Sequence, residues 1–174
     1  MVRSMNLIVT TQRGLEARAS KELKEIILES GTRKISIEKS SYDGILEVEV
    51  ENPRGLVAFL ADLIRLDPFK INFIQRVIPV DRVVDTKMEE IRNSVTELSS
   101  SILPGETFRV TVEARDSPYS SKELIDNVAE LVERKVNLKT PDKVVLLQVF
   151  GEYTCISVLR PQEILSVQKL KRSY

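Results

Sequence analysis

The chain has 174 residues, of which 42% are hydrophobic and 30% charged, the composition of a soluble globular protein of one or two domains. Its 26 basic and 26 acidic side chains cancel, so overall charge does not indicate a nucleic-acid binder, and any basic surface must come from local clustering. The single cysteine, Cys155, excludes an internal disulfide framework. Without an apolar run of membrane-spanning length or a signal peptide, we expect a cytoplasmic protein with no membrane partner.

The first half of the chain, residues 1–85, is predicted to form an N-terminal domain. A short β-branched run over residues 6–11 predicts its first strand. Apolar residues then recur at helical spacing from Leu15 to Ile27, with Gly31 placed where a helix commonly ends. These two elements are therefore expected to be a strand followed by an amphipathic helix.

A hairpin and a second helix complete this domain. Alternating apolar residues over 35–37 and 45–50 flank a Tyr-Asp-Gly turn, which indicates two paired strands. Asn52 followed by Pro53 is typical of a helix N-terminus, and residues 70–80 are predicted to return as a strand. The order β-α-β-β-α-β is the ferredoxin-like pattern, with the helices on one face of an antiparallel sheet.

Residues 86–174 are predicted to form a second domain. Thr86 and Glu89 have the spacing of a capping box, and the amphipathic helix after them should stop at Pro104. In the strand that follows, Thr107 to Arg115, apolar and polar side chains alternate. We expect one face of that strand to join the core and the other to be presented to a ligand.

The remaining elements of the second domain follow the same logic. Ser120 and Glu123 form another capping-box pattern ahead of a helix. Val144 to Phe150 is almost continuously apolar, which favours a central strand buried on both faces. A glycine turn then leads into a last strand, Tyr153 to Leu159. The pattern leaves open whether the segment after Pro161 is a helix or an edge strand.

The chain lacks most of the usual catalytic chemistry. It has no histidine, which removes Ser-His and Cys-His pairs, histidine metal sites and the usual general base near neutral pH. One cysteine cannot build a zinc site, and Cys155 is expected to be a small buried hydrophobe. No glycine-rich phosphate loop is present. We therefore expect no enzyme, no metal and no cofactor, although a mechanism using carboxylates alone is not ruled out by sequence.

Basic residues in and around the second predicted sheet are the candidates for phosphate contacts. They are Arg109, Arg115, Lys122, Lys135, Lys139, Lys143 and Arg160. Arginine can hold a phosphate with two N–H groups, and the helix N-terminus near Ser120 adds backbone N–H groups. The alternative is that these are ordinary solvated charges paired with nearby glutamates. A surface that contacts several phosphates would bind RNA with strong salt dependence.

Three consecutive pieces of this half resemble a THUMP domain, a module of tRNA-modifying systems: FRVTVEAR, SSKELIDNVAELVERKVNL and PDKVVLLQVFGEYTCISVL. The chain is most similar to the THUMP protein of the tRNA N4-acetylcytidine system. Its ferredoxin-like first half also fits, because such a domain commonly precedes a THUMP domain. The implied fold class is α+β, an N-terminal ferredoxin-like domain followed by a THUMP-like α/β domain with two helices on a small mixed sheet.

The resemblance implies a non-catalytic adaptor that binds the acceptor end of tRNA and presents it to a separate RNA acetyltransferase. It gives Arg109 and Arg115 the role of RNA-backbone contacts, with the other five basic residues as weaker candidates. A rival from another class is a protein-interaction or ligand-sensing α+β module that does not bind RNA. The sequence leaves open which tRNAs and which position are modified, the oligomeric state, and the mobility between the two halves.

Overall fold

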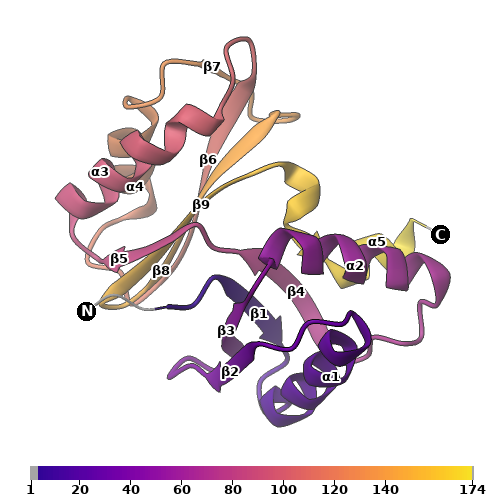
Figure 1. Cartoon of the computed structure of the whole chain (residues 1–174). Coiled ribbons are helices and arrows are strands. Elements are labelled where there is room, and N and C mark those ends of the chain that lie inside the picture. The colour runs from indigo at the N-terminus through magenta and orange to yellow at the C-terminus, as the bar shows by residue number, and fades with distance from the viewer. Residues whose placement is uncertain (1–3, 174) are drawn as a thin grey trace. The chain divides into compact units, whose positions relative to one another are not determined.

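The computed structural model describes residues 4–173, which divide into two compact units, each with its own sheet (Figure 1). The first unit combines Met5–Pro79 with the segment from Glu163 onward, and the second contains Val80–Gln162. This differs from the predicted boundary at residue 85, because the end of the predicted second domain belongs to the first unit. In the part of the chain that is described, no helix is long and apolar enough to cross a membrane.

The first unit has the predicted ferredoxin-like order. Its elements are β1 (Leu7–Thr11), α1 (Glu16–Glu29), β2 (Ile35–Lys39), β3 (Ile45–Val50), α2 (Pro53–Leu66) and β4 (Ile74–Pro79). The strands lie in the order β4-β1-β3-β2, and each neighbouring pair is antiparallel. Buried residues of α1 and α2 share one core with the sheet, so the α+β architecture is confirmed for this half.

Local chemistry explains where these elements begin. The side chain of Asn52 accepts a hydrogen bond from the Gly55 N–H at 2.9 Å, which confirms the predicted cap of α2. The strand predicted over 70–80 begins only at β4, because a glutamate binds the preceding backbone. The two Glu22 carboxylate oxygens accept from the N–H groups of Asn72 and Phe73 at 2.9 and 3.0 Å, so these groups do not enter the sheet.

The segment whose structure the sequence left open contains both alternatives. A 3-10 turn, η2 (Pro161–Glu163), leads into the short edge strand β10 (Leu165–Ser166) and then into α5 (Val167–Arg172). β10 pairs with β4 in an antiparallel arrangement. Leu165 is buried in the core of the first unit, which anchors this late segment among residues far earlier in the chain.

The second unit is a mixed sheet with two helices on one face, as predicted (Figure 1). Its elements are β5 (Arg82–Asp85), α3 (Met88–Leu98), η1 (Ser99–Ser101), β6 (Thr107–Arg115), α4 (Ser121–Ala129), β7 (Lys135–Val136), β8 (Lys143–Phe150) and β9 (Tyr153–Leu159). The strand order is β5-β9-β8-β6-β7, in which β6 is parallel to β7 and β8 and the other pairs are antiparallel.

Strand β8 is central and buried along its whole length, as its apolar sequence predicted. Val145, Leu147 and Val149 share a core with Ile91 of α3 and Leu124 of α4. Because side chains alternate across a strand, these residues define the helix-covered face of the sheet.

The two predicted capping boxes had different outcomes. The box at Ser120 is confirmed, since its hydroxyl accepts from the Glu123 N–H at 3.1 Å and the Glu123 carboxylate accepts from the Ser120 N–H. The box at Thr86 was wrong. The chain is still extended there, and the Thr86 hydroxyl bonds to that of Thr154 at 2.8 Å. At the start of α3, the Tyr119 hydroxyl instead accepts from the Met88 N–H at 3.0 Å.

Candidate nucleic-acid interface

Arg109 and Arg115 lie on the face of β6 away from α3 and α4. Phe108, Val110 and Val112 point toward the helices, so the alternate positions point to the opposite face. The two arginines are six residues apart on the strand, which places their backbones about 20 Å apart. They therefore cannot grip one phosphate together, and each belongs to a different end of the unit.

The two arginines have different surroundings. Arg109 is half-buried, and its Nη1 donates to the carbonyl oxygen of Leu138 at 3.0 Å, which ties the loop after β7 to the sheet. Arg115 is exposed, and its guanidinium group lies 5.5 Å from the centre of the Phe150 ring. That cation–π contact orients the side chain while leaving the guanidinium N–H groups at the surface. Arg115 is thus the more accessible of the two for a ligand.

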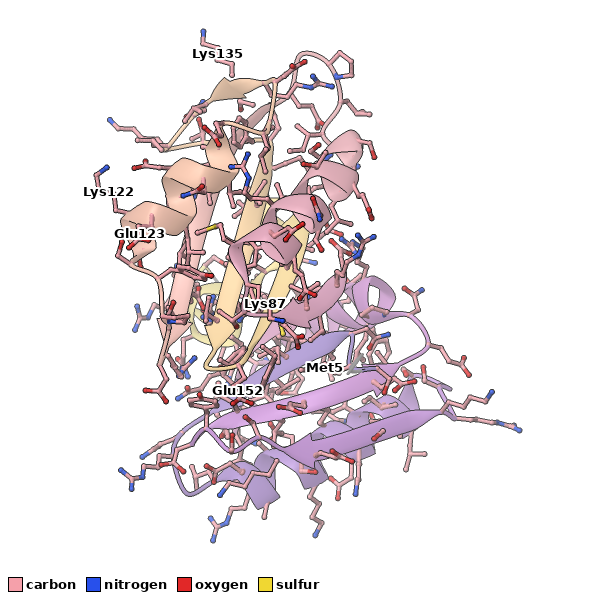
Figure 2. The ribbon with its side chains drawn as sticks, turned by 90° about the vertical axis from the view of Figure 1, so that its left-hand side faces the viewer. Met5, Lys87, Lys122, Glu123, Lys135 and Glu152 are labelled. Atoms are coloured by element: carbon pink, nitrogen blue, oxygen red, sulfur yellow. The ribbon has the colours of Figure 1, made fainter. Side chains whose placement is uncertain are left out.

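Around β7 the chain presents cations and apolar side chains to solvent together. We call residues 135–141, with the turn at Leu103, the β7 tip. Lys135 and Lys139 are exposed, and neither forms an ion pair with any residue between positions 4 and 173. Beside them, Leu138 is 70% exposed, Leu103 58% and Val136 50%. Figure 2 shows Lys135 projecting at this end of the unit.

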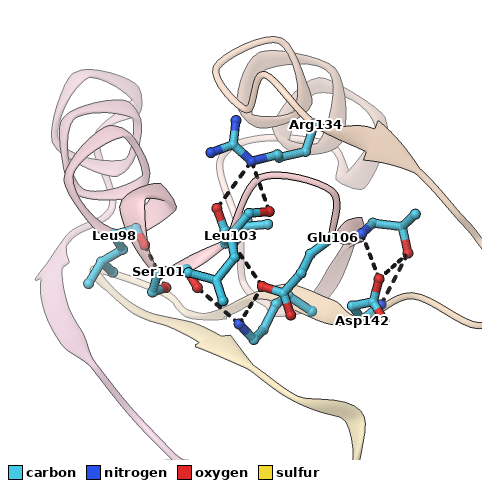
Figure 3. Close-up of polar contacts among 9 residues, drawn as sticks. Leu98, Ser101, Leu103, Glu106, Arg134 and Asp142 are labelled. Carbon is cyan, nitrogen blue, oxygen red and sulfur yellow. Dashed lines mark hydrogen bonds and ion pairs between the residues drawn. The ribbon is translucent and has the colours of Figure 1, made fainter.

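A polar network braces the base of the β7 tip (Figure 3). Arg134 Nε donates to the carbonyl oxygens of Ile102 and Leu103 at 3.1 and 3.2 Å, which joins the tip to the turn before β6. The Glu106 carboxylate accepts from the Leu103 N–H at 2.7 Å and closes that turn on itself. The exposed tip therefore rests on a fixed base, which favours a defined binding surface over a mobile loop.

Two carboxylates in this network have perturbed acidity. A hydrogen bond from Lys143 holds the pKa of Glu106 below its usual range, and the Leu103 N–H acts in the same direction. Hydrogen bonds from the Thr107 N–H and hydroxyl likewise lower the pKa of Asp142. Both side chains are therefore ionised at neutral pH and hold the start of β6 against the start of β8.

Lys143 has a structural role. It is 9% exposed, and its ammonium group donates to the Ser101 carbonyl oxygen and to Glu106, each at 2.9 Å. We therefore leave it out of the ligand surface. Its position in the buried strand β8 was visible in the sequence, but the direction of its side chain was not.

The other two candidates are exposed but separate. Lys122 lies on α4 (Figure 2). Its ammonium group pairs with Asp126 at 2.6 Å, and this contact raises the pKa of Lys122. Arg160 directly follows β9, and since Leu159 pairs with Val144, it lies at the β7 end of the sheet. The structure thus groups Arg109, the tip lysines and Arg160 toward one end of the sheet, with Arg115 at the other end and Lys122 apart on α4.

Sequence reasoning missed the apolar part of the surface. Leu103, Val136 and Leu138 look like core residues by composition, but they lie outside the regular periodicity of the helices and strands. The signal that could have found them is the run KVNLK, in which apolar residues alternate with polar ones in a segment too short for a buried strand.

Residues 85–159 match the family model of the THUMP domain, so the second unit carries that domain. The chain is 28% identical, over 97% of its length, to uncharacterized protein MJ0421 of Methanocaldococcus jannaschii, of which it spans 45%. The chain spans about half or less of the length of several proteins to which it is similar.

Solved structures share the fold. PH1313 from Pyrococcus horikoshii superposes with a TM-score of 0.69 at 17% identity, over 90% of this chain and 55% of that one. TrmN from Thermus thermophilus gives 0.57 at 20% identity, over 91% and 47%. A 4-thiouridine synthetase in complex with RNA and ATP gives 0.57 at 16% identity, over 90% and 41%. At these identities the likeness establishes the fold, and both units are included in it.

Proposed function

We propose that this chain, with its THUMP domain at residues 85–159, is a non-catalytic adaptor that binds tRNA. In this proposal it presents tRNA to a separate RNA acetyltransferase that forms N4-acetylcytidine. RNA binding is supported by the β7 tip, where Lys135 and Lys139 are exposed and unpaired within the domain. A 4-thiouridine synthetase of similar fold has been solved with RNA, which favours RNA over another polyanion.

The chemistry of the tip fits an RNA backbone. Ammonium groups without an internal partner attract phosphates and displace their counterions, which contributes to affinity. The neighbouring Leu138 and Val136 can cover the apolar faces of sugars or bases without aromatic stacking. Arg115, about 20 Å from Arg109 along β6, can supply a second phosphate contact on the same ligand. Such contacts recognise the shape of RNA and its backbone, as expected for structured RNA.

The adaptor role is supported by the side-chain chemistry of the chain. The sequence has no histidine, and its one thiol, Cys155, is fully buried. Among the residues that the structure describes, no cluster of three or more carboxylate and thiol groups could hold a metal ion. The basic and apolar groups of the β7 tip can hold a substrate but do not form a proton-transferring set. We therefore assign the acetyl transfer to a partner protein.

The binding part of the proposal is tested with charge reversal on the tip. Lys135→Glu/Lys139→Glu should weaken tRNA binding by at least about tenfold at low salt, since two phosphate attractions become repulsions. Lys21→Glu/Lys24→Glu, two exposed positions on α1, is the matched control with the same change in net charge. Equal losses in both variants would show that net charge matters and the tip does not. Arg109→Ala is less suitable, because it also releases the Leu138 loop.

The adaptor part needs a reconstituted reaction. Purified RNA cytidine acetyltransferase is incubated with tRNA, with and without this chain, and N4-acetylcytidine is measured by mass spectrometry of the nucleosides. Acetylation that depends on the chain supports the adaptor, whereas acetylation by the chain alone would make it an enzyme. Absent or salt-insensitive tRNA binding would instead favour the protein-interaction or ligand-sensing alternative.

A further inference from the structure

Strand β2 lies at one edge of the first unit's sheet, and among the described strands it pairs only with β3. The Ser40 N–H donates to the Ile45 carbonyl oxygen at 3.0 Å, which fixes the alternation of hydrogen bonds in this hairpin. The backbone groups of Glu38 and Ser36, at every second position before Ser40, therefore form hydrogen bonds with β3. The backbone N–H and C=O groups of Ile35, Ile37 and Lys39 point outward instead, available to another strand.

A cavity of about 370 Å³ lies at the N-terminal end of β2. Its charged lining comes from both strands of the hairpin, with Arg33 and Lys34 on one side and Glu49 and Glu51 on the other. We call it the β2 cavity. An open edge next to a cavity is the arrangement by which a sheet accepts an added strand, with the backbone giving affinity and the cavity receiving side chains.

We propose that β2 docks against β2 of a second copy of this chain, antiparallel, so that the two sheets become one. The strand is complementary to itself when Ser36 lies on the two-fold axis. In that register Lys34 faces Glu38 of the second copy on both sides of the axis, and Ile35 faces Ile37 of the second copy. Opposite charges and β-branched pairs are both favourable across neighbouring strands.

The neighbouring registers are less favourable. An axis at Glu38 sets two like charges directly opposite each other, which is destabilising. With the axis at Ile37, Glu38 lies opposite Ser36 of the second copy, and no opposite-charge pair forms. The register on Ser36 leaves a like-charged pair, Arg33 with Lys39, at each end of the ladder, where the exposed side chains can separate in water. Charge therefore selects the axis at Ser36.

The same register also fills the β2 cavity. The incoming strand brings its Glu38 to the end of β2 where the cavity lies, and Arg33 and Lys34 of the lining are cations that complement it. Charged residues commonly protect an edge strand from indiscriminate pairing. Here their order admits a second copy and opposes strands with a different charge pattern. The buried area is small, so the dimer is expected to be weak and visible at high protein concentration.

Sedimentation velocity without RNA measures this association, so its result is independent of the proposed tRNA role. Lys34→Glu and Glu38→Lys should each weaken self-association by at least about tenfold, because both attractions become repulsions. An equimolar mixture of the two variants should recover it, since the charges are again opposite. A wild-type chain that stays monomeric up to about 1 mM, well above the range of even weak specific contacts, overturns the proposal. So does a mixture no stronger than its components.

The register is tested by cross-linking. Ser36→Cys should form a disulfide-linked dimer under mild oxidation, because residues on the axis are a non-hydrogen-bonded pair with Cα atoms about 4.5 Å apart. Glu49→Cys, exposed on the neighbouring strand β3, is the control, since its two copies would lie about 14 Å apart, three strand spacings. Cross-linking of both variants to the same extent, or of neither, overturns the register.

Discussion

The ammonium group of Lys143 lies 2.9 Å from a carboxylate oxygen of Glu106, and this pair joins the start of β8 to the turn before β6. The Lys143 side chain is 11% exposed and that of Glu106 25%. The lysine also donates to the Ser101 carbonyl oxygen, so its ammonium group holds two acceptors from the segment before β6. A residue that the sequence offered as a weaker candidate for a phosphate contact therefore stabilises the base of the β7 tip.

This relationship separates stability from the proposed RNA binding. Lys143→Met should lower the melting temperature by several degrees, because it removes a largely buried ion pair with Glu106 and the donor to the Ser101 carbonyl group. It should leave unchanged the slope of log affinity against log salt. Lys139→Gln should behave in the opposite way, with little change in stability and a slope smaller in magnitude by about one. Thermal melts and tRNA titrations at several salt concentrations check both variants. A shallower slope for folded Lys143→Met would return that lysine to the interface.

Acid should destabilise the second unit through Glu106 and Asp142. Their pKa values in the folded chain lie below the ordinary values of 4.5 and 3.8. The unfolded chain therefore takes up protons first, so the stabilisation is complete above these ordinary values and is lost as the pH falls through the folded values. Glu106→Gln should be less stable than wild type at neutral pH and should lose less stability on acidification.

Thermal melts between about pH 7 and pH 3 measure that difference. Glu89→Gln, an exposed position on α3, is the matched control and should follow the wild-type profile. Glu16 contributes an acid-sensitive contact in the first unit, where its carboxylate accepts from the Gly44 N–H at 2.8 Å and its pKa is lowered. If the melting temperature of Glu106→Gln fell with pH in parallel with that of wild type, Glu106 would not be a source of the acid sensitivity.

The cap of α4 gives a prediction with a neighbouring control. Ser120→Ala removes the hydroxyl that accepts from the Glu123 N–H and should cost about 1 kcal/mol of unfolding free energy. Ser121→Ala, one residue into the helix, should change stability by less than about 0.5 kcal/mol. Chemical denaturation of the two variants side by side makes the comparison. Equal costs would mean that the capping bond contributes nothing measurable.

The hydroxyl of Tyr119 is expected to hold the start of α3. Tyr119→Phe should destabilise the unit by about 1 kcal/mol and speed hydrogen exchange at the Met88 amide, which loses its acceptor. Tyr42→Phe, in the first unit, is the control for the exchange measurement. Unchanged exchange at Met88 in Tyr119→Phe would show that water replaces the hydroxyl without loss.

The sequence predicted elements whose information is local. The helix at Asn52, the cap at Ser120 and the buried strand from Val144 follow from spacing and burial patterns that need no distant partner. The capping box predicted at Thr86 was wrong because of a tertiary contact. Strand β5 pairs with β9 up to Asp85, so the chain is still extended where the Thr-x-x-Glu pattern suggested a helix start. The pairing of β5 with β9 therefore outweighed the local tendency to begin a helix at Thr86.

The candidate binding surface was only partly predictable for a similar reason. A basic residue is recognisable in sequence, but whether it points into a network depends on groups brought together by folding. Lys143 forms a hydrogen bond with Glu106, which is 37 positions away in the sequence, and Arg109 with Leu138, which is 29 positions away. The exposure of Leu103 could not be predicted either, since a single apolar residue in a turn forms no periodic pattern that would indicate whether it is buried. The sequence could therefore identify the candidate basic residues but could not distinguish the exposed ones from those held in internal hydrogen bonds.

The return of the segment from Glu163 to the first unit sets the order in which the chain can mature on a ribosome. All the described residues of the second unit are synthesised before β10 and α5 of the first, since these two elements follow it in the sequence. The THUMP domain can therefore close while the earlier ferredoxin-like sheet still waits for its fifth strand. Until then β4 has an unpaired edge on the nascent chain, and an unpaired edge can pair with the strand of another chain.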